Sequence, residues 1–494
     1  MRTACDRAGL AGGAGAHLFL TTFLYSEPVV NEKKSYFLVG VGGSGMLPLA
    51  LILRAKGFAV EGSDRALDQG RTAPKFDDLR AAGVRLHPQD GSGVVAPSQI
   101  VVASAAVEAT VPDIVAARTI GAGVVSRAAL LAELFNAAPT GIGVAGTSGK
   151  STTTGMIGWI LHAAGRDPTV MNGAVMKNFV RPGALFASAL VGKGPHFVSE
   201  LDESDGSIAF FAPKIAALNN IALDHKSMDE LRRLFSDFVA KAETAVLNLD
   251  NAETRAIAAA RGAGVISYSL ADSGARLFAD AIAPRPFGVS FTAHDCAEGL
   301  SARVDLAMPG RHNVANALAA IGAALAAGVP FGEAAAALSG FEGVKRRLEF
   351  VGERAGVVVI DDFAHNPDKL SASFRTLHEH PGRLLVLFQP HGFGPIHKMK
   401  REFIETFTEH LYKDDILVMP EPVYFGGTVD RATSSRDLAE AVAAAGLRAE
   451  AFATREEAGE RLLAEVRPGD RIVVMGARDD TLPAFAAGLL ARLG

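Results

Sequence analysis

The segment that decides the fold is Ile142-Gly143-Val144-Ala145-Gly146-Thr147-Ser148-Gly149-Lys150-Ser151. An apolar run, a glycine-rich turn, a lysine and a hydroxyl residue are typical of a strand that passes into a helix around a phosphate group. Backbone N–H groups would face the anion, Lys150 would reach the β- and γ-phosphates, and the Ser151 hydroxyl would bind Mg²⁺. Val144 stands where the longer form of this motif has its first glycine. The segment therefore predicts a phosphate-binding turn of a shorter form; a turn without ligand is the alternative.

Length and composition indicate an ordinary globular protein. The 494 residues predict about three domains. Hydrophobic residues make up 49% and charged residues 21%, which allows sizeable cores. The net charge of −5 argues against nucleic-acid binding. Cys5 and Cys296 are too few for a disulfide scaffold or a multi-cysteine zinc site, and they fit a reducing, cytoplasmic location.

The first 33 residues differ from the rest of the chain. Residues 8–26 carry no charged side chain and end in an apolar run, so a signal or membrane segment is one interpretation. The first half is rich in Gly and Ala, and no convincing cleavage site follows. We therefore expect residues 1–33 to be a disordered leader or the product of a start codon assigned too early. No other stretch is long and apolar enough to cross a membrane.

A second glycine-rich turn begins the ordered sequence. The apolar run at 35–39 predicts a strand, Gly40, Gly42 and Gly45 follow it, and a helix is predicted at 46–56. A second strand at 58–60 leads to Asp64. This pattern is typical of a dinucleotide-type unit, in which an acidic residue about 20 positions on meets a ribose hydroxyl. A plain tight turn is the alternative.

Strand and helix signals alternate along most of the chain, which predicts an α/β protein with parallel sheets. We expect three domains: a Rossmann-like N-terminal domain, a central P-loop ATPase domain with a mostly parallel sheet, and a Rossmann-like C-terminal domain. Their predicted bounds are 34–138, 139–345 and 346–494, with linkers at 136–140 and 343–347. Further strands are predicted at 100–103, 123–125, 197–198, 215–218, 245–248, 357–360, 384–388, 416–419 and 472–475, helices at 228–241 and 313–327, and an irregular β-rich region at 262–308.

Four polar clusters follow predicted strands or begin a helix. Residues 199–205 hold four carboxylates in seven positions, which favours a bound cation over a solvated acidic loop. Residues 219–225 end in an Asp-His pair suited to metal binding or phosphate orientation, although a lone histidine is more often structural. Asn313 and Asn316 lie three positions apart at a helix start and suit the edge of a purine, unless Asn313 only caps the helix.

The fourth cluster, residues 359–367, places carboxylate, imidazole and amide groups at a strand end, as a site or as an Asx-type turn before proline. The clusters share their position with the phosphate turn. Each falls at the carboxyl end of a predicted strand or at a helix start, where open α/β sheets bind ligands. Their joint occurrence therefore favours a single site over a set of unrelated turns.

Together these segments resemble the Mur ligase family, the ATP-dependent enzymes that build the stem peptide of peptidoglycan. The resemblance covers nearly all of residues 34–494, and its motifs are very specific. The segments that carry it are residues 37–46, 145–154, 172–173, 202–205, 224–225, 309–313, 346–347 and 388–391. It implies one domain for a UDP-sugar, one for ATP and one for the incoming amino acid.

The resemblance also implies roles for individual residues. The catalytic residues would be Lys150, His225, Arg347 and His365, and the magnesium ligands would be Ser151, Glu200 and His225. ATP would be bound by Gly146, Thr147, Ser148, Gly149, Lys150, Ser151, Thr152, His312, Asn313, Asn316, Arg347 and Asp362. The UDP-sugar would be bound by Gly40, Gly42, Gly43, Ser44, Gly45, Met46, Asp64 and Ser104.

Within the family, the chain looks most like the members that join L-alanine to UDP-N-acetylmuramate through an acyl phosphate, with ATP and Mg²⁺. An amino acid or short peptide is the implied partner, and we expect a monomer or homodimer. The alternative is the related recycling ligase that attaches the tripeptide L-Ala-γ-D-Glu-meso-diaminopimelate.

Two hypotheses from other functional classes are a non-catalytic nucleotide-binding regulator and an NAD-dependent oxidoreductase. The retained Lys150, Glu200, Asp224 and His225 argue against the first, and the second phosphate turn argues against the last.

The chain departs from the alanine-adding pattern in its last third. Those members usually carry an Arg directly after Pro390-His391 and a second Arg three residues later, where this chain has Gly392 and Pro395. Those arginines hold carboxylate or phosphate groups, so the identity of the acceptor stays open. The run from Asp361 to His365 looks more like the recycling ligase. Arg478 is a candidate for a displaced carboxylate anchor, and a surface ion pair is the alternative.

Overall fold

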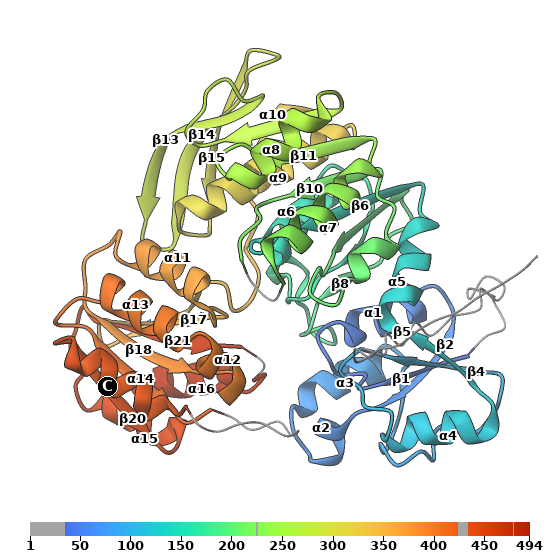
Figure 1. Ribbon diagram of the computed structural model, residues 1–494, viewed down its shortest axis with the longest axis horizontal. Coiled ribbons are helices and arrows are strands. Elements are labelled where there is room, and N and C mark those ends of the chain that lie inside the picture. The colour runs from blue at the N-terminus through green and yellow to red at the C-terminus, as the bar shows by residue number, and fades with distance from the viewer. Residues whose placement is uncertain (1–34, 224–225, 423–432, 478) are drawn as a thin grey trace, which may run out of the picture.

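The computed structural model describes residues 35–223, 226–422, 433–477 and 479–494. Three of the residues singled out above lie outside these ranges: Asp224, His225 and Arg478. The described residues form three separate β-sheets with helices around them. Figure 1 shows the N-terminal unit (blue) and the C-terminal unit (orange to red) lying below the central unit (green).

The N-terminal sheet has five parallel strands in the order β3-β2-β1-β4-β5. This order, with helices after β1, β2, β4 and β5, confirms the Rossmann-like expectation for this unit. The strands are β1 (Ser35–Val39), β2 (Ala59–Ser63), β3 (Arg85–His87), β4 (Gln99–Ala103) and β5 (Gly123–Ser126). The helices are α1 (Met46–Ala55), α2 (Arg65–Asp68), α3 (Ala73–Ala81), α4 (Pro112–Ile120) and α5 (Arg127–Asn136).

The central sheet has ten strands in the order β15-β14-β13-β12-β11-β10-β6-β9-β7-β8. The strands are β6 (Thr140–Ala145), β7 (Thr169–Met171), β8 (Ala189–Leu190), β9 (His196–Glu200), β10 (Ile215–Leu218), β11 (Thr244–Asn248), β12 (Val265–Ser269), β13 (Leu277–Arg285), β14 (Gly288–Asp295) and β15 (Leu300–Leu306). Its inner strands are parallel, and the pairs β13–β14, β14–β15 and β7–β8 are antiparallel. The β-rich region expected at 262–308 comprises the parallel strand β12 and the antiparallel strands β13, β14 and β15.

The helices of the central unit include a closely packed pair, α6 and α9. They are α6 (Lys150–Ala163), α7 (Met228–Ala240), α8 (Ala252–Arg261), α9 (Arg311–Ala326) and α10 (Phe331–Leu338), with the short helices η1 (Lys177–Phe179) and η2 (Ser207–Phe210). The alanines at 317, 319, 320, 323 and 324 are fully buried. A Cβ at Gly322 would come 2.7 Å from Cγ1 of Val246, so small residues let α9 lie directly on the sheet.

The C-terminal sheet has six strands in the order β16-β17-β21-β18-β19-β20, and only β16 is antiparallel to its neighbour. The strands are β16 (Glu349–Arg354), β17 (Val357–Asp362), β18 (Leu384–Gln389), β19 (Ile416–Pro420), β20 (Arg448–Phe452) and β21 (Arg471–Gly476). The helices are α11 (Pro367–Leu377), α12 (Phe393–Lys398), α13 (Lys400–His410), α14 (Ser435–Ala444), α15 (Arg455–Leu463) and α16 (Leu482–Ala491). β18 and β21 are buried along their whole length, as expected for strands covered on both faces.

The linkers differ in part from the prediction. Asn136 is the last residue of α5 and Thr140 the first of β6, so the expected linker at 136–140 shrinks to three residues. The predicted domain boundaries at 138/139 and 345/346 stay predictions, and they would leave each sheet intact. Within the residues described, no helix combines the length and apolar character needed to cross a membrane.

Candidate active site

The phosphate turn joins β6 to α6 as expected. Gly146 has φ +129° and Gly149 has φ +82°, which favour glycine at both positions. A Cβ at Gly149 would also come 2.5 Å from the side-chain oxygen of Asn316. Asn220 supports the turn, because its side-chain oxygen accepts a hydrogen bond from the backbone N–H of Ser148 at 3.0 Å. The glycine pattern therefore reflects both the backbone conformation and the close approach of neighbouring amides.

Lys150 and Ser151 are held by carboxylates of the acidic cluster at 199–205. The Lys150 ammonium donates to the carbonyl of Gly146 at 2.7 Å and pairs with Glu203 at 2.9 Å. The Ser151 hydroxyl donates to Glu200 at 2.7 Å. The other two carboxylates of the cluster, those of Asp202 and Asp205, accept from nearby backbone N–H groups. Two of the four therefore face the phosphate turn.

A magnesium ion fits the Ser151–Glu200 pair. A hydroxyl and a carboxylate supply the oxygen ligands that Mg²⁺ prefers. A Cβ at Gly173 would come 2.0 Å from a carboxylate oxygen of Glu200, so glycine at this position leaves room for that side chain. The third predicted ligand, His225, lies outside the described residues. Among the described residues, no group of three or more His, Cys, Asp and Glu side chains is arranged to hold a metal.

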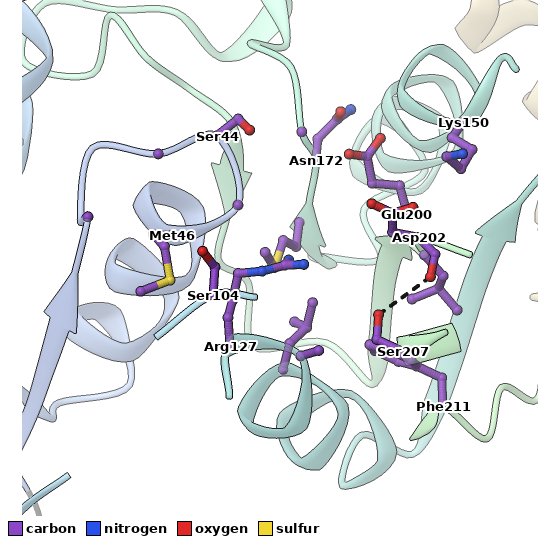
Figure 2. Close-up of a pocket in the computed structure, with 18 of the residues that line it drawn as sticks. Ser44, Met46, Ser104, Arg127, Lys150, Asn172, Glu200, Asp202, Ser207 and Phe211 are labelled. Carbon is purple, nitrogen blue, oxygen red and sulfur yellow. Dashed lines mark hydrogen bonds between the residues drawn. The ribbon is translucent and has the colours of Figure 1, made fainter. Parts of the chain in front are cut away.

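Two cavities meet at Lys150, which contributes to the walls of both. The first, of about 320 Å³, separates the glycine turn of the N-terminal unit from the loops after β7 and β9 (Figure 2). The second, of about 450 Å³, lies between the phosphate turn, the start of α9 and the C-terminal unit. Two ligands bound in these cavities would therefore approach each other at the phosphate turn.

The second cavity gathers almost all of the residues predicted to bind ATP. Its wall contains Thr147, Ser148, Gly149, Lys150, Ser151, Thr152, His312, Asn313, Asn316, Arg347 and Asp362, and also His365. Gly146 is the one predicted residue that does not line it. The ring of His312 is open to this cavity, and desolvation by the surrounding walls lowers its pKa, which favours the neutral imidazole.

Asn313 and Asn316 lie on one face of α9, as expected. The Asn316 amide donates to the side-chain oxygen of Asn313 at 3.1 Å, and the Asn313 amide donates to the Pro309 carbonyl at 2.7 Å. The alternative that Asn313 caps the helix is wrong, because Gly310 occupies the N-cap position and no side chain caps the helix. Both amides are nearly completely buried, so only a small part of each is presented to the cavity.

The linker after Val344 holds two adjacent arginines in different ways. Arg346 and Leu348 have positive φ values of 60° and 47°. Arg346 is buried, donates to the Gly476 carbonyl at 2.7 Å and pairs with Asp361 at 3.3 Å. Arg347 projects into the second cavity, with its guanidinium 4.5 Å from the ring centre of Phe363. Arg346 therefore anchors the linker, and Arg347 is the one that lines the cavity.

The residues of the cluster at 359–367 differ in role: some make hydrogen bonds that stabilise the local fold, and some line the second cavity. The Asp362 carboxylate is buried, accepts from Ser373 and from the Leu348 backbone, and burial raises its pKa. Asn366 caps α11 by accepting from the N–H of Lys369 at 3.0 Å, which confirms the Asx-type alternative for that residue. His365 lines the cavity, and burial lowers its pKa well below the ordinary value.

Most residues predicted to bind a UDP-sugar line the first cavity, but two do not. Gly40, Gly43, Ser44, Gly45, Met46 and Ser104 are in its wall. Gly42 and Asp64 are not, because they bond to each other: Asp64 accepts from the Gly42 N–H at 2.8 Å. The other Asp64 oxygen accepts from the Ala66 N–H at 2.8 Å and caps α2. The Asp64 carboxylate thus supports the turn, and its expected contact with a ribose stays a prediction.

Sequence reasoning missed one cation in the first cavity, Arg127, at the start of α5. It follows β5 directly, so the rule that strand ends carry site residues applied to it as well. The signal was weak, because Ser126-Arg127 contains only one charged residue in an otherwise ordinary strand–helix junction. Asn172 and Gly173, noted only as part of a family resemblance, line the same cavity.

Comparisons with known proteins agree with this architecture. Residues 36–138 match the Mur ligase family catalytic domain, 144–324 the Mur ligase middle domain, and 346–478 the Mur ligase glutamate ligase domain. A UDP-N-acetylmuramate–L-alanine ligase of Synechococcus sp. is 35% identical over 481 residues, covering 94% of this chain and 95% of the relative. A ligase of the same name from Geobacter sulfurreducens is 35% identical over 456 residues, covering 90% and 95%.

Solved structures agree as well. The UDP-N-acetylmuramate-alanine ligase of Thermotoga maritima has a TM-score of 0.75 at 23% identity, covering 92% of this chain and 98% of that one, which shows the shared fold. A murein peptide ligase of Psychrobacter arcticus has a TM-score of 0.69 at 26% identity, covering 93% and 98%. With three family domains in order along one chain, and relatives of this identity over nine tenths of it, the chain belongs to the Mur ligase family of ATP-dependent enzymes.

Proposed function

We propose that this protein joins L-alanine to UDP-N-acetylmuramate, using ATP. The observation that carries this proposal is the 35% identity, over 94% of the chain, to a ligase of that name. The two cavities that meet at Lys150 support it, because the reaction needs a nucleotide sugar and ATP to approach at one point. The first cavity would hold the UDP-sugar and the second would hold ATP.

In the first step, a carboxylate oxygen of the sugar forms a bond to the γ-phosphorus of ATP, and the bond to the β-phosphate oxygen breaks. A free carboxylate is a poor electrophile, and the acyl phosphate carries a leaving group. Lys150 would leave Glu203 to bind the transferring phosphoryl group, and Arg347 would neutralise its charge from across the linker. The chain thus contributes position and positive charge.

The Ser151 hydroxyl and the Glu200 carboxylate would hold Mg²⁺, with His225 as the third predicted ligand. Mg²⁺ supplies charge neutralisation of the phosphate oxygens in such reactions. Since Glu200 lines the first cavity and Ser151 the second, this pair lies where the two ligands would meet.

In the second step, the amine nitrogen forms a bond to the carbonyl carbon, inorganic phosphate leaves, and the nitrogen loses a proton. His365 is suited to take that proton. Its Nδ1 lies 2.8 Å from the Phe363 carbonyl, which can only accept, so Nδ1 carries the hydrogen and Nε2 is left as the base. Its lowered pKa favours the neutral imidazole that this role requires.

The tripeptide-recycling ligase is the second candidate. Gly392 and Pro395 stand where the alanine-adding members usually carry arginines. The Psychrobacter structure is called a murein peptide ligase and covers 93% of this chain. A larger acceptor would have carboxylates in other places, so it does not depend on cations at these two positions.

We also expect the protein to be located in the cytoplasm and to be a monomer or a homodimer.

A phosphate-release assay separates these possibilities. The full chain is incubated with ATP, Mg²⁺, UDP-N-acetylmuramate and, in turn, each of the standard amino acids and the tripeptide L-Ala-γ-D-Glu-meso-diaminopimelate. We expect phosphate release with L-alanine, and mass spectrometry should find the amide product. Turnover with the tripeptide alone would replace the proposal by the recycling reaction. ATP binding without turnover on any acceptor would favour a non-catalytic regulator.

A further inference from the structure

The first cavity has two cations in its wall, and they differ in how they are held. Lys150 is engaged by Glu203 and by the Gly146 carbonyl. Arg127 makes no hydrogen bond and no ion pair within residues 35–223, 226–422, 433–477 and 479–494. Its side chain is half-buried and points into the cavity, between the glycine turn and the acidic side formed by Glu200 and Asp202 (Figure 2).

Gly45 leaves space for this arginine. Gly45 has φ −97°, a conformation open to any residue, so backbone geometry does not demand a glycine. A Cβ there would come 2.9 Å from Nη1 of Arg127 and 3.2 Å from its Cζ. The guanidinium therefore lies directly against the last residue of the turn that precedes α1.

The position of Arg127 has an electrostatic cost. Arg127 is the first residue of α5, and a cation in the first turn of a helix lies at the positive end of the helix dipole. The Ser126 side chain already caps that helix by accepting from the Ala129 N–H at 3.1 Å. A bound anion would offset this cost, and no anionic side chain pairs with Arg127 among the described residues.

We propose that Arg127 binds the diphosphate of the nucleotide sugar, against the glycine turn at 40–45. This inference rests on the proposed function and adds a residue to its UDP-sugar site. A guanidinium presents parallel N–H donors that match phosphate oxygens. The backbone N–H groups of residues 40–43 already donate within the N-terminal unit, so those of Ser44 and Gly45 are the ones the turn offers beside it. The reacting carboxylate of the sugar must lie near Lys150, on the opposite wall, because the phosphoryl group arrives there.

The acidic wall of the cavity favours the same orientation of the bound nucleotide sugar, with its diphosphate at the glycine turn. Glu200 and Asp202 both line this wall, and the Asp202 carboxylate accepts a hydrogen bond from the Ser204 N–H at 2.9 Å. Asp202 and Glu200 would repel a diphosphate from their side. Arg127 is the cation on the side of the glycine turn, so it draws the most highly charged part of the ligand there.

Isothermal titration calorimetry with UDP tests this directly, without ATP or acceptor. The full-length wild type is compared with Arg127→Gln, Arg127→Lys and the control Arg118→Gln, which removes an exposed arginine from α4 in the same unit. We expect Arg127→Gln to weaken UDP binding about 10- to 100-fold, the effect of losing hydrogen bonds to a charged group. Arg127→Lys should fall in between, and Arg118→Gln should bind like wild type.

The same titrations with UDP-N-acetylmuramate distinguish diphosphate from carboxylate recognition. We expect the Arg127→Gln substitution to weaken the binding of UDP and of UDP-N-acetylmuramate by the same factor. A variant that bound UDP normally and lost affinity only for the muramate would place Arg127 at the carboxylate and overturn the inference. Unchanged binding of both ligands would also overturn it. Wild-type protein that bound neither ligand would reject the proposed function itself. Retained ATP binding and thermal midpoint in the variants separate these results from misfolding.

Discussion

The side chain on which the proposed chemistry depends most is Lys150, because it lies in the walls of both cavities. Replacing it with alanine should lower turnover by roughly 10²–10³-fold, the usual cost of removing one group that stabilises transition-state charge. Lys193→Ala, at an exposed lysine of the same unit, is the matched control. Phosphate release and the thermal midpoint are measured for both. Wild-type turnover in Lys150→Ala would show that the phosphate turn does not bind the transferred group.

A second residue-scale prediction concerns pH. Asp361 is 1% exposed, and desolvation is the main cause that raises its pKa from 3.8 to about 6, against the opposing charge of Arg346. Between these values the folded chain holds a proton that the unfolded chain has released. The resulting stability is present below about pH 4 and is lost as the pH rises through 6, by about 3 kcal/mol.

The measurement for Asp361 compares thermal midpoints of wild type and Asp361→Asn from about pH 4 to 7.5. The asparagine variant does not titrate, so its midpoint should gain on that of the wild type as the pH rises. Any constant offset from the lost Arg346 contact leaves this slope untouched. Parallel curves for the two proteins would rule out a raised pKa at this position.

At the scale of elements, we predict opposite effects for substitutions of two neighbouring arginines in the linker at 343–347. Arg346→Ala removes the buried partner of Asp361 and the donor to the Gly476 carbonyl, so unfolding should become easier by about 3 kcal/mol. Arg347→Ala removes a guanidinium that stacks on Phe363 and faces the cavity. It should cost about 1 kcal/mol of stability or less and reduce turnover by roughly 10²-fold.

The test is to measure the thermal midpoint and the phosphate-release rate of both linker variants. The expected pattern is a large loss of stability for Arg346→Ala and a large loss of turnover, with a nearly normal midpoint, for Arg347→Ala. The reverse pattern would mean that the two arginines have been assigned to the wrong roles. Equal effects would mean that the linker acts as one unit.

The same scale shows how far sequence patterns predict this fold. Strands in continuous apolar runs were predicted well, and the bounds of β1 and β10 coincide with the prediction. The strands that were missed include β3, β8, β16 and β20, each at the edge of its sheet. An edge strand is half-buried and short of apolar residues, so it lacks the burial on both faces that makes a strand visible in sequence. β7, an inner strand of three residues, was also missed because it is so short.

The sequence predicts where in the fold the candidate site lies. Polar clusters at the carboxyl ends of strands do meet, because parallel strands end at one edge of the sheet. The direction of each side chain was not predictable. Asp64 turns back to the Gly42 N–H, and Arg127, at an inconspicuous strand end, points into the cavity. Such choices depend on neighbours distant in sequence, and spacing carries no information about them.

At the scale of the whole molecule, an ion pair between described residues joins the N-terminal and C-terminal units. Lys75 on α3 pairs with Asp480, which follows β21, and its ammonium lies 5.5 Å from the ring centre of Phe186 in the central unit. The neighbouring Phe76 packs against the glycine turn, where a Cβ at Gly42 would come 2.9 Å from it. Near Asp480, the Asp479 carbonyl accepts from Arg346. The pair therefore joins α3, which packs beside the glycine turn, to the segment after β21 that also holds Arg346.

Asp480→Asn should loosen this closed arrangement. The Lys75 side chain is 8% exposed and the Asp480 side chain 58%, so the pair is worth about 1 kcal/mol, or about a fivefold shift toward open forms. The radius of gyration from small-angle X-ray scattering should rise, and KM for the acceptor should increase about fivefold. Asp77→Asn, which breaks an exposed pair with Arg80 within α3, is the control and should change neither. Added salt should raise KM of the wild type toward that of Asp480→Asn, because screening weakens an exposed pair; a salt response shared equally by all three proteins would mean that this contact does not hold the units together.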